Sequence, residues 1–168
     1  MPWINPENEK HCLEMLNTAN AEICMGHFDL NGFRMMDHMV QTHGYDKSIV
    51  SRFEKVYSGH FHHKNDDGQV FYLGSQYEMT WSDYNNQKGF HVFDTETREI
   101  EFIHNPHTIF KKLMYDDTNT NYDNFDVTEY NQEFIKLVVV NKKDNQMFDR
   151  LLDRLYKNIS VHELKILE

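Results

Sequence analysis

The sequence of 168 residues predicts an α/β (α+β) fold, with a loop-rich first part and a more regular second part. All seven glycines lie at or before Gly89, so the turns that shape a site are concentrated in the first part. Beyond Gly59, apolar residues recur at every second position in several runs, which is typical of strands. Near the C-terminus a strand pattern, a helix pattern and another strand pattern follow one another, which indicates a small β-α-β module.

Composition limits the classes of protein that the chain can represent. The length suits one domain, or one domain with a small appendage. There is no apolar run of 18 or more residues and no basic stretch at the N-terminus, so we expect neither a membrane helix nor a signal peptide. Cys12 and Cys24 make no disulfide framework, which favours reduced thiols in a cytoplasmic protein, with Cys24 buried in a strand. The net charge of −10 argues against indiscriminate nucleic-acid binding, although metal ions can mediate a local contact with DNA.

The first elements follow in order from the N-terminus. Asn5, Pro6 and Glu7 are a cap residue, a proline at the first helical position and an acid in the first turn, and they predict the start of a helix. The apolar run 22–25 predicts a buried strand that ends in a loop over 26–29. A second helix over 46–53 and a strand over 55–57 then lead to Gly59.

The later elements are mostly strands. We predict strands over 69–73, 89–93, 99–103 and 109–115, with the polar turn 94–98 joining two of them into a hairpin. The segment 116–124 is rich in Asp, Asn and Thr, so we place a linker over 116–132, between a first domain over 1–115 and a module over 133–168. The module contains a strand over 134–140, a helix whose apolar face runs from Met147 to Leu155, and a strand over 161–167.

Gly59-His60-Phe61-His62 is the stretch most indicative of chemistry. Residues two apart in an extended backbone project to the same face, and the glycine permits a sharp turn. His27 also follows a glycine at the end of a predicted strand, and loops at the carboxyl ends of neighbouring strands are where open α/β sheets place their sites. Three neutral imidazoles suit Zn²⁺, Mn²⁺ or Fe²⁺, so His27, His60 and His62 are the candidate metal ligands.

Other readings of these residues stay open. A histidine in a loop is more often an ordinary polar residue than a metal ligand. His63 has the opposite parity to His62, so we expect it to point away, and we treat His38, His43 and His91 as structural or surface residues. Asp29 either orients His27 by a hydrogen bond or caps the next turn.

These residues carry a resemblance to a known family. Gly59-His60-Phe61-His62 resembles the last metal motif, Gly-His-x-His, of calcineurin-like metallophosphoesterases, and Gly26-His27 resembles their preceding single-histidine motif. The flanks are similar to the SbcD-type DNA-repair nucleases, especially the branch of the phage recombination endonuclease subunit. The stretches that carry this likeness are 2–4, 7–10, 72–75, 88–90 and 93–97, and it extends from Pro2 to about Pro106.

The resemblance implies a fold and an activity. It implies part of a β-sandwich flanked by helices, followed by a small α/β capping module that is incomplete here. The family's activity is hydrolysis of DNA phosphodiesters, as exonuclease or endonuclease, in recombination and double-strand-break repair. It uses two metal ions, usually Mn²⁺, with Zn²⁺ or Mg²⁺ as alternatives. By motif, His27 and His60 would bind one metal and His62 the other, and the implied partners are DNA and an SMC-like ATPase subunit.

The sequence also departs from the family. It has no Asp-x-His, no Gly-Asp and no Asn-His, so the early motifs that supply the bridging carboxylate and the histidine that protonates the leaving group are absent. We therefore assign no catalytic residue and expect the chain alone to be inactive, needing a separate N-terminal half or self-association. The alternative is a non-catalytic remnant or regulatory binding protein with at most one structural metal. A third reading is an α/β domain whose histidines bind nothing.

Overall fold

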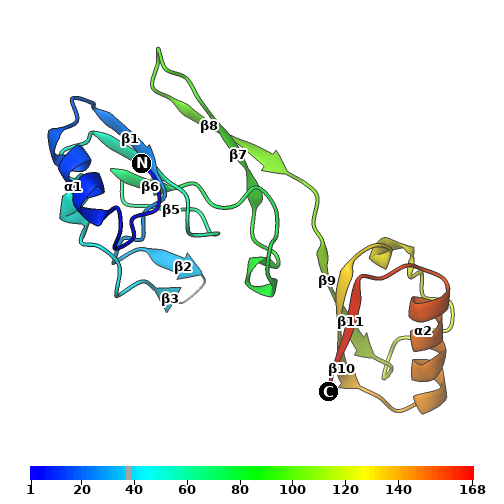
Figure 1. Cartoon of the computed structure of the whole chain (residues 1–168). Coiled ribbons are helices and arrows are strands. Elements are labelled where there is room, and N and C mark those ends of the chain that lie inside the picture. The colour runs from blue at the N-terminus through cyan, green and yellow to red at the C-terminus, as the bar shows by residue number, and fades with distance from the viewer. Residues whose placement is uncertain (37–38) are drawn as a thin grey trace. The chain divides into compact units, whose positions relative to one another are not determined.

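The computed structural model describes residues 1–36 and 39–168, and these form two compact units, Met1–Pro106 and His107–Glu168 (Figure 1). Strands dominate both units, and the described residues contain two α-helices, one in each unit. The predicted α+β class is therefore confirmed. Neither of these helices has the length and apolar character that crossing a membrane requires.

The described part of the first unit consists of one α-helix, two short 3-10 turns and short strands. The sequence-ordered elements are α1 (Glu9–Thr18), β1 (Ile23–Gly26), β2 (Arg34–Met36), β3 (Met39–Val40), η1 (Lys47–Val50), β4 (Lys55–Ser58), β5 (Asn65–Asp66), β6 (Val70–Tyr72), η2 (Trp81–Asp83), β7 (Lys88–Phe93) and β8 (Ile100–Asn105).

 The two 3-10 turns among them, η1 and η2, span four and three residues, so α1 is the one α-helix of the described part of this unit.

A four-stranded sheet with the order β1-β4-β6-β5 forms the centre of the first unit. β1, β4 and β6 are parallel, and β5 pairs antiparallel with β6 at one edge. β1 and β4 are in register, with Gly26 opposite Ser58. Because parallel strands end at the same edge of a sheet, the loops that follow β1 and β4 leave the sheet side by side.

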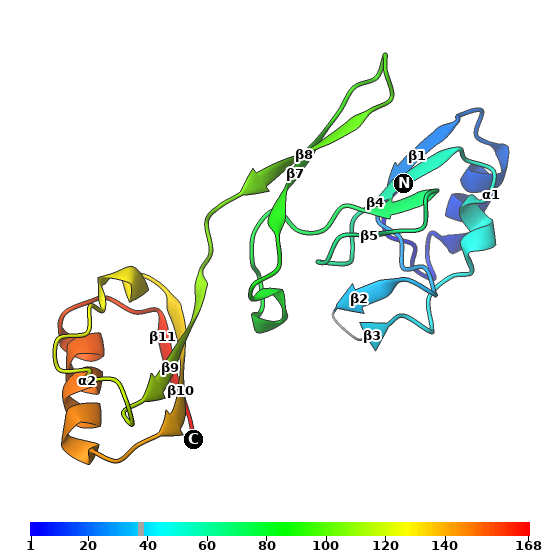
Figure 2. The same ribbon diagram turned by 180° about the vertical axis from the view of Figure 1, so that it is seen from behind.

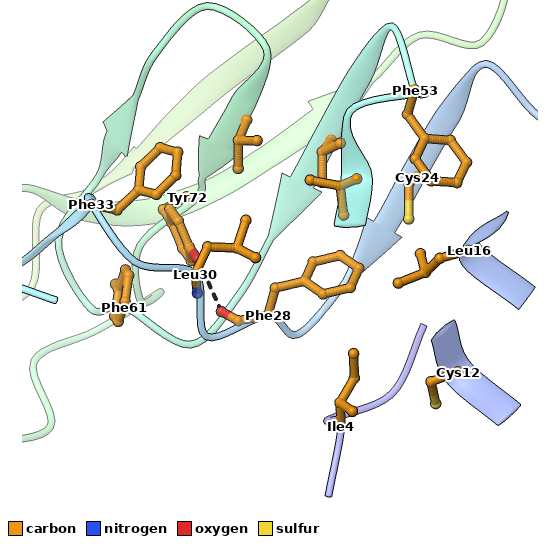
Figure 3. Packing of buried hydrophobic residues seen from close by; sticks show 13 residues of the cluster. Ile4, Cys12, Leu16, Cys24, Phe28, Leu30, Phe33, Phe53, Phe61 and Tyr72 are labelled. Carbon is orange, nitrogen blue, oxygen red and sulfur yellow. Dashed lines mark hydrogen bonds between the residues drawn. The ribbon is translucent and has the colours of Figure 1, made fainter. Parts of the chain in front are cut away.

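The core of the first unit lies between α1 and this sheet (Figure 3). Cys12 and Leu16 from the buried side of α1 pack with Cys24 of β1, which is a buried free thiol as predicted. Tyr72 is also buried, and its hydroxyl donates a hydrogen bond to the carbonyl of Phe28 at 3.1 Å (Figure 3). The core therefore reaches the loop that follows β1.

Two predicted helices differ from the structure in extent. α1 begins at Glu9 because Asn5 to Asn8 first form a turn, in which the Asn5 side chain accepts hydrogen bonds from the backbone amides of Glu7 and Asn8. The segment 46–53 forms only the short turn η1, in which the Asp46 carboxylate accepts the backbone amide of Ser48. The pair β2 and β3 and the edge strand β5 have no counterpart in the prediction, since strands of two or three residues give almost no periodic signal.

The predicted hairpin is present as β7 and β8, which pair antiparallel from Lys88 opposite Asn105 to Phe93 opposite Ile100. Asp94 closes its turn, because the Asp94 carboxylate accepts the backbone amides of Glu96 and Thr97. Gly89 is required where the two strands approach, since a Cβ there would lie 2.1 Å from the carbonyl oxygen of Ile103. The hairpin forms a separate two-stranded sheet.

The second unit is a parallel three-stranded sheet with one helix on one face (Figure 2). Its elements are β9 (Phe110–Asp116), η3 (Thr128–Tyr130), β10 (Phe134–Asn141), α2 (Asn145–Lys157) and β11 (Glu163–Leu167). The sheet order is β11-β10-β9, and Leu151 and Leu155 of α2 are fully buried against it. Asp144 caps α2 by accepting the backbone amide of Met147. The predicted strand, helix and strand of the C-terminal module correspond to β10, α2 and β11.

The division between the units differs from the predicted boundary at residue 115. The units separate after Pro106 because β9 pairs with β10 and so belongs to the second unit. The segment placed as a linker over 116–132 contributes Tyr122, Val127 and Tyr130 to the buried core of that unit. These three residues are flanked in the sequence by polar residues, so the segment shows no apolar pattern that would indicate its part in the core.

Candidate metal centre

His27 and His60 lie together where β1 and β4 end. The backbone amide of Gly59 donates to the carbonyl of Gly26 at 3.0 Å, which extends the parallel pairing to the start of both loops. The imidazole rings of His27 and His60 are 5.4 Å apart between centroids and nearly perpendicular. Two of the three predicted ligands therefore lie together, and they do so at the ends of neighbouring parallel strands, as the sequence predicted.

Gly59 allows this approach. A Cβ at Gly59 would lie 2.8 Å from Nδ1 of His27, which is closer than a carbon side chain tolerates. The next residue, His60, has a φ of 90°, in the left-handed region that non-glycine residues rarely adopt. Such strain persists only where the surrounding structure enforces it, and it is frequent at functional sites.

Trp3 covers the histidine pair. Its ring lies 4.6 Å from the His60 ring and 5.7 Å from the His27 ring, between centroids. Burial lowers the pKa of His60, against the raising effect of the nearby Asp29 carboxylate, while His27 and His62 add to the lowering. The His60 imidazole is therefore held toward its neutral form, which is the form that binds metals.

Asp29 lies beside His60. One carboxylate oxygen of Asp29 is 3.7 Å from Nε2 of His60 and accepts a hydrogen bond of 2.6 Å from the Gln41 side chain. The backbone carbonyl of Asp29 accepts from the amide of Tyr45 at 2.7 Å. These contacts connect the Asp29 side chain to His60 and Gln41, whereas the sequence suggested an orienting bond to His27 or a turn cap.

His62 is held by a different carboxylate. Its Nδ1 is 3.2 Å from Oδ2 of Asp83, which is fully buried. Burial tends to raise the pKa of Asp83, but hydrogen bonds from Lys88 and from the backbone amides of Met79 and Thr80 outweigh it, so the pKa is well below the ordinary value. Asp83 is therefore an ionised carboxylate at neutral pH.

The remaining histidines have other surroundings. His63 is buried, with Nε2 at 3.1 Å from the carbonyl of Ser82, so it contacts the same 3-10 turn, η2, as the partly exposed His62. The His91 ring lies 5.0 Å from that of Phe102 on the hairpin. His43 is exposed at the rim of the cavity described next, and His38 lies outside the described residues.

Two cavities adjoin the candidate ligands. The larger, of about 410 Å³, has His27 and Asp29 in its wall and is otherwise lined by Trp3, Ile4, Glu9, His43, Gly44 and Tyr45. The smaller, of about 260 Å³, is lined by His60 and His62 together with Met35, Met36, Phe61, Thr80 and Ser82. Both histidine-bearing loops therefore border space that a small ligand can enter.

The candidate ligands are of the types that bind metal ions, but their side chains are not arranged around a common point. Within residues 1–36 and 39–168, the side chains form no group of three His, Cys, Asp or Glu arranged to hold a metal. Imidazole nitrogen and carboxylate oxygen are nevertheless the donors that Mn²⁺ and Zn²⁺ accept, and His27, His60 and Asp29 supply both at one place. The metal-binding roles of His27, His60 and His62 stay predictions.

Sequence reasoning missed the residues that support these histidines. Trp3, Asp83 and Lys88 are separated from their histidine partners by 21 or more positions. No periodicity or spacing rule connects residues so far apart. The stretches 2–4 and 88–90, which carry the family resemblance, include Trp3 and Lys88, but nothing in the sequence connects these residues with a histidine.

Comparison with known proteins relates the chain to phage nucleases. The chain is similar to exonuclease subunit 1 of Enterobacteria phage T4, with 37% identity over 115 residues. The match covers 68% of this chain and 34% of the phage protein, so the chain spans about a third of the length of that relative. No family model matches the sequence.

Proposed function

We propose that the chain is part of a metal-dependent DNA nuclease that hydrolyses phosphodiesters in recombination and double-strand-break repair. The observation that carries this proposal is the pair of imidazoles, His27 and His60, 5.4 Å apart at two adjacent strand ends in a chain similar to a phage exonuclease subunit. Neutral imidazoles beside a carboxylate offer the ligands that a hydrolytic metal centre needs.

The roles of the residues follow from their places. His27 and His60 would hold one Mn²⁺ ion and His62 a second, with Zn²⁺ or Mg²⁺ as alternatives. Bound metal ions in such a centre activate water and neutralise charge on the phosphate. Asp29 borders His60 and would orient it, and the net charge of −10 makes cation-mediated contact the favoured way to hold DNA.

The site requires ligands that these histidines do not supply. We propose that the bridging carboxylate and the remaining histidine come from a segment carrying Asp-x-His, Gly-Asp and Gly-Asn-His, on another chain or a further part of this one. The phage relative is named as a subunit, which supports a complex, and the proposed partners are DNA and an SMC-like ATPase subunit.

Complementation tests the proposal. The chain is mixed with a segment that carries the three early motifs, and cleavage of linear DNA is measured with and without Mn²⁺. We expect Mn²⁺-dependent cleavage from the mixture, loss of cleavage with His60→Ala, and no loss with His11→Ala, which changes an exposed histidine of α1. Cleavage that survives His60→Ala, or no cleavage in any mixture, contradicts the proposal.

A second candidate function is a non-catalytic or regulatory binding protein with at most one structural metal. The observation in its favour is that the described side chains do not converge on a metal as they stand. Metal analysis separates the two: tightly held Zn²⁺ in the purified chain, unaffected by DNA and without hydrolysis in the mixture, supports the binding protein.

A further inference from the structure

A buried ion pair lies directly behind His62. Asp83 is 0% exposed and Lys88 is 2% exposed, and the Lys88 ammonium donates to Oδ1 of Asp83 at 2.9 Å. The other carboxylate oxygen, Oδ2, accepts the backbone amides of Met79 and Thr80 at 3.0 and 2.8 Å. The carboxylate is therefore fixed in position from both sides.

This pair holds His62 at two points. Oδ2 of Asp83 meets Nδ1 of the imidazole at 3.2 Å, and the Lys88 ammonium donates to the backbone carbonyl of His62 at 2.8 Å. The amide of Ser75 donates to the same carbonyl at 3.1 Å. Main chain and side chain of His62 are thus both anchored to buried groups, while the ring itself remains about a third exposed, at 33%.

The hydrogen bonds determine which ring nitrogen is available. An ionised carboxylate only accepts hydrogen bonds, so Nδ1 of His62 must carry the proton that it shares with Asp83. In a neutral imidazole with Nδ1 protonated, Nε2 has a free lone pair. Nε2 is then the nitrogen that can bind a metal, and the ring is held in one orientation.

A purely stabilising role explains the pair poorly. A buried ion pair contributes little stability relative to well-packed apolar residues of similar volume, because both charges lose their hydration. Asp83 does close the short turn η2 through the amide of Thr80, but an exposed aspartate can close a turn without a buried lysine. The lysine is explained by the need for an ionised, immobile acceptor next to His62.

We infer that Asp83, supported by Lys88, is a positioning residue that presents Nε2 of His62 to a metal ion. The inference rests on the proposed function for the identity of the ligand, but the hydrogen-bond assignment stands independently of it. Outer partners of metal-binding histidines fix the tautomer and orientation of the ring, and their loss typically weakens metal binding about 10- to 100-fold.

The first test reads the tautomer directly, in the metal-free 168-residue chain. Long-range ¹H–¹⁵N spectra of the histidine side chains, assigned with His62→Ala, distinguish a protonated Nδ1 from a protonated Nε2. We expect a proton on Nδ1 of His62, shared with Asp83. A ring with its proton on Nε2 alone in the unaltered chain overturns the inference.

The second test removes the acceptor while keeping the volume. In the double variant Asp83→Leu/Lys88→Met, apolar side chains replace the ion pair, and the backbone amide spectrum checks the fold. We expect His62 to move toward the Nε2-protonated tautomer. A matched variant, Lys47→Met, removes the lysine of a surface ion pair with Asp67 and should leave the tautomer unchanged. An unchanged tautomer in the folded double variant contradicts the inference.

The third test connects the pair to metal binding. Calorimetric titration with Mn²⁺ should show binding about 10- to 100-fold weaker in the double variant than in the unaltered chain. In a His62→Ala background the same double variant should weaken binding by less than about twofold, because the effect passes through His62. Equal weakening in both backgrounds indicates a structural role and overturns the inference. If the unaltered chain alone binds no Mn²⁺, the titration is repeated with the segment that carries the three early motifs; absence of binding there contradicts the proposed function, and the tautomer still decides the positioning role.

Discussion

The hydroxyl of Tyr72 should be essential to the loop between β1 and β2. It donates to the carbonyl of Phe28 and accepts from the amide of Leu30, both at 3.1 Å, and all three residues are 2% exposed or less. Burial raises the pKa of Tyr72 to about 12, so the hydroxyl stays protonated at neutral pH. Tyr72→Phe keeps the ring and removes both hydrogen bonds. Leaving buried polar groups without this partner costs about 1–3 kcal/mol in the free energy of unfolding.

Urea denaturation followed by tryptophan fluorescence measures this loss. Both tryptophans, Trp3 and Trp81, lie in the first unit, so the signal reports on the unit that contains Tyr72. Tyr45→Phe is the control, because its hydroxyl makes an exposed hydrogen bond to Glu9, and it should change stability by less than about 0.5 kcal/mol. Equal stabilities of the two variants would refute the reasoning.

Three further predictions concern the site and the second unit. Gly59→Ala places a methyl group 2.8 Å from His27, so it should displace that imidazole and weaken Mn²⁺ binding about tenfold in calorimetry. Leu151→Ala, at a fully buried position of α2, should cost about 2–5 kcal/mol in urea denaturation followed by circular dichroism, and Leu152→Ala, at a partly buried position, should cost less. Hydrogen bonds from two backbone amides before α2 lower the pKa of Asp117. Asp117→Asn should therefore destabilise the chain at neutral pH, and the difference from the unaltered chain should disappear as pH falls below about 4, measured by denaturation across pH.

Elements with a regular apolar pattern were predictable from the sequence. β10 and α2 have clear periodicities of two and 3.6, and they lie where those periods place them. The hairpin of β7 and β8 was predictable because a polar turn separates two alternating runs. In these elements the spacing of apolar residues in the sequence matches the face that is buried in the structure.

The domain boundary depended on information that is not local. β9 reads as a strand in the sequence, but its partner β10 lies beyond a polar segment that looks like a linker. The buried side chains of that segment, Tyr122 and Tyr130 among them, are spaced irregularly and make no helix or strand pattern. Assigning β9 to its unit requires knowledge of its pairing.

The candidate site shows the same limit. His27 and His60 could be placed together because a general rule connects the ends of parallel strands. Asp83 and Lys88 could not be placed, because their contacts with His62 arise from the path of the chain between β6 and β7. The sequence therefore predicted the candidate ligands better than the groups that orient them.

The parallel pairing of β1 and β4 also determines when the histidine pair can exist. Parallel neighbours cannot be joined by a tight turn, so this pairing closes a long loop of chain. Contacts between distant residues form late and slowly during folding, since the entropy of loop closure is lost before they stabilise the chain. A short peptide spanning Gly59 to His62 has no means to recruit His27. Metal uptake through both histidines should thus accompany completion of the fold of the first unit.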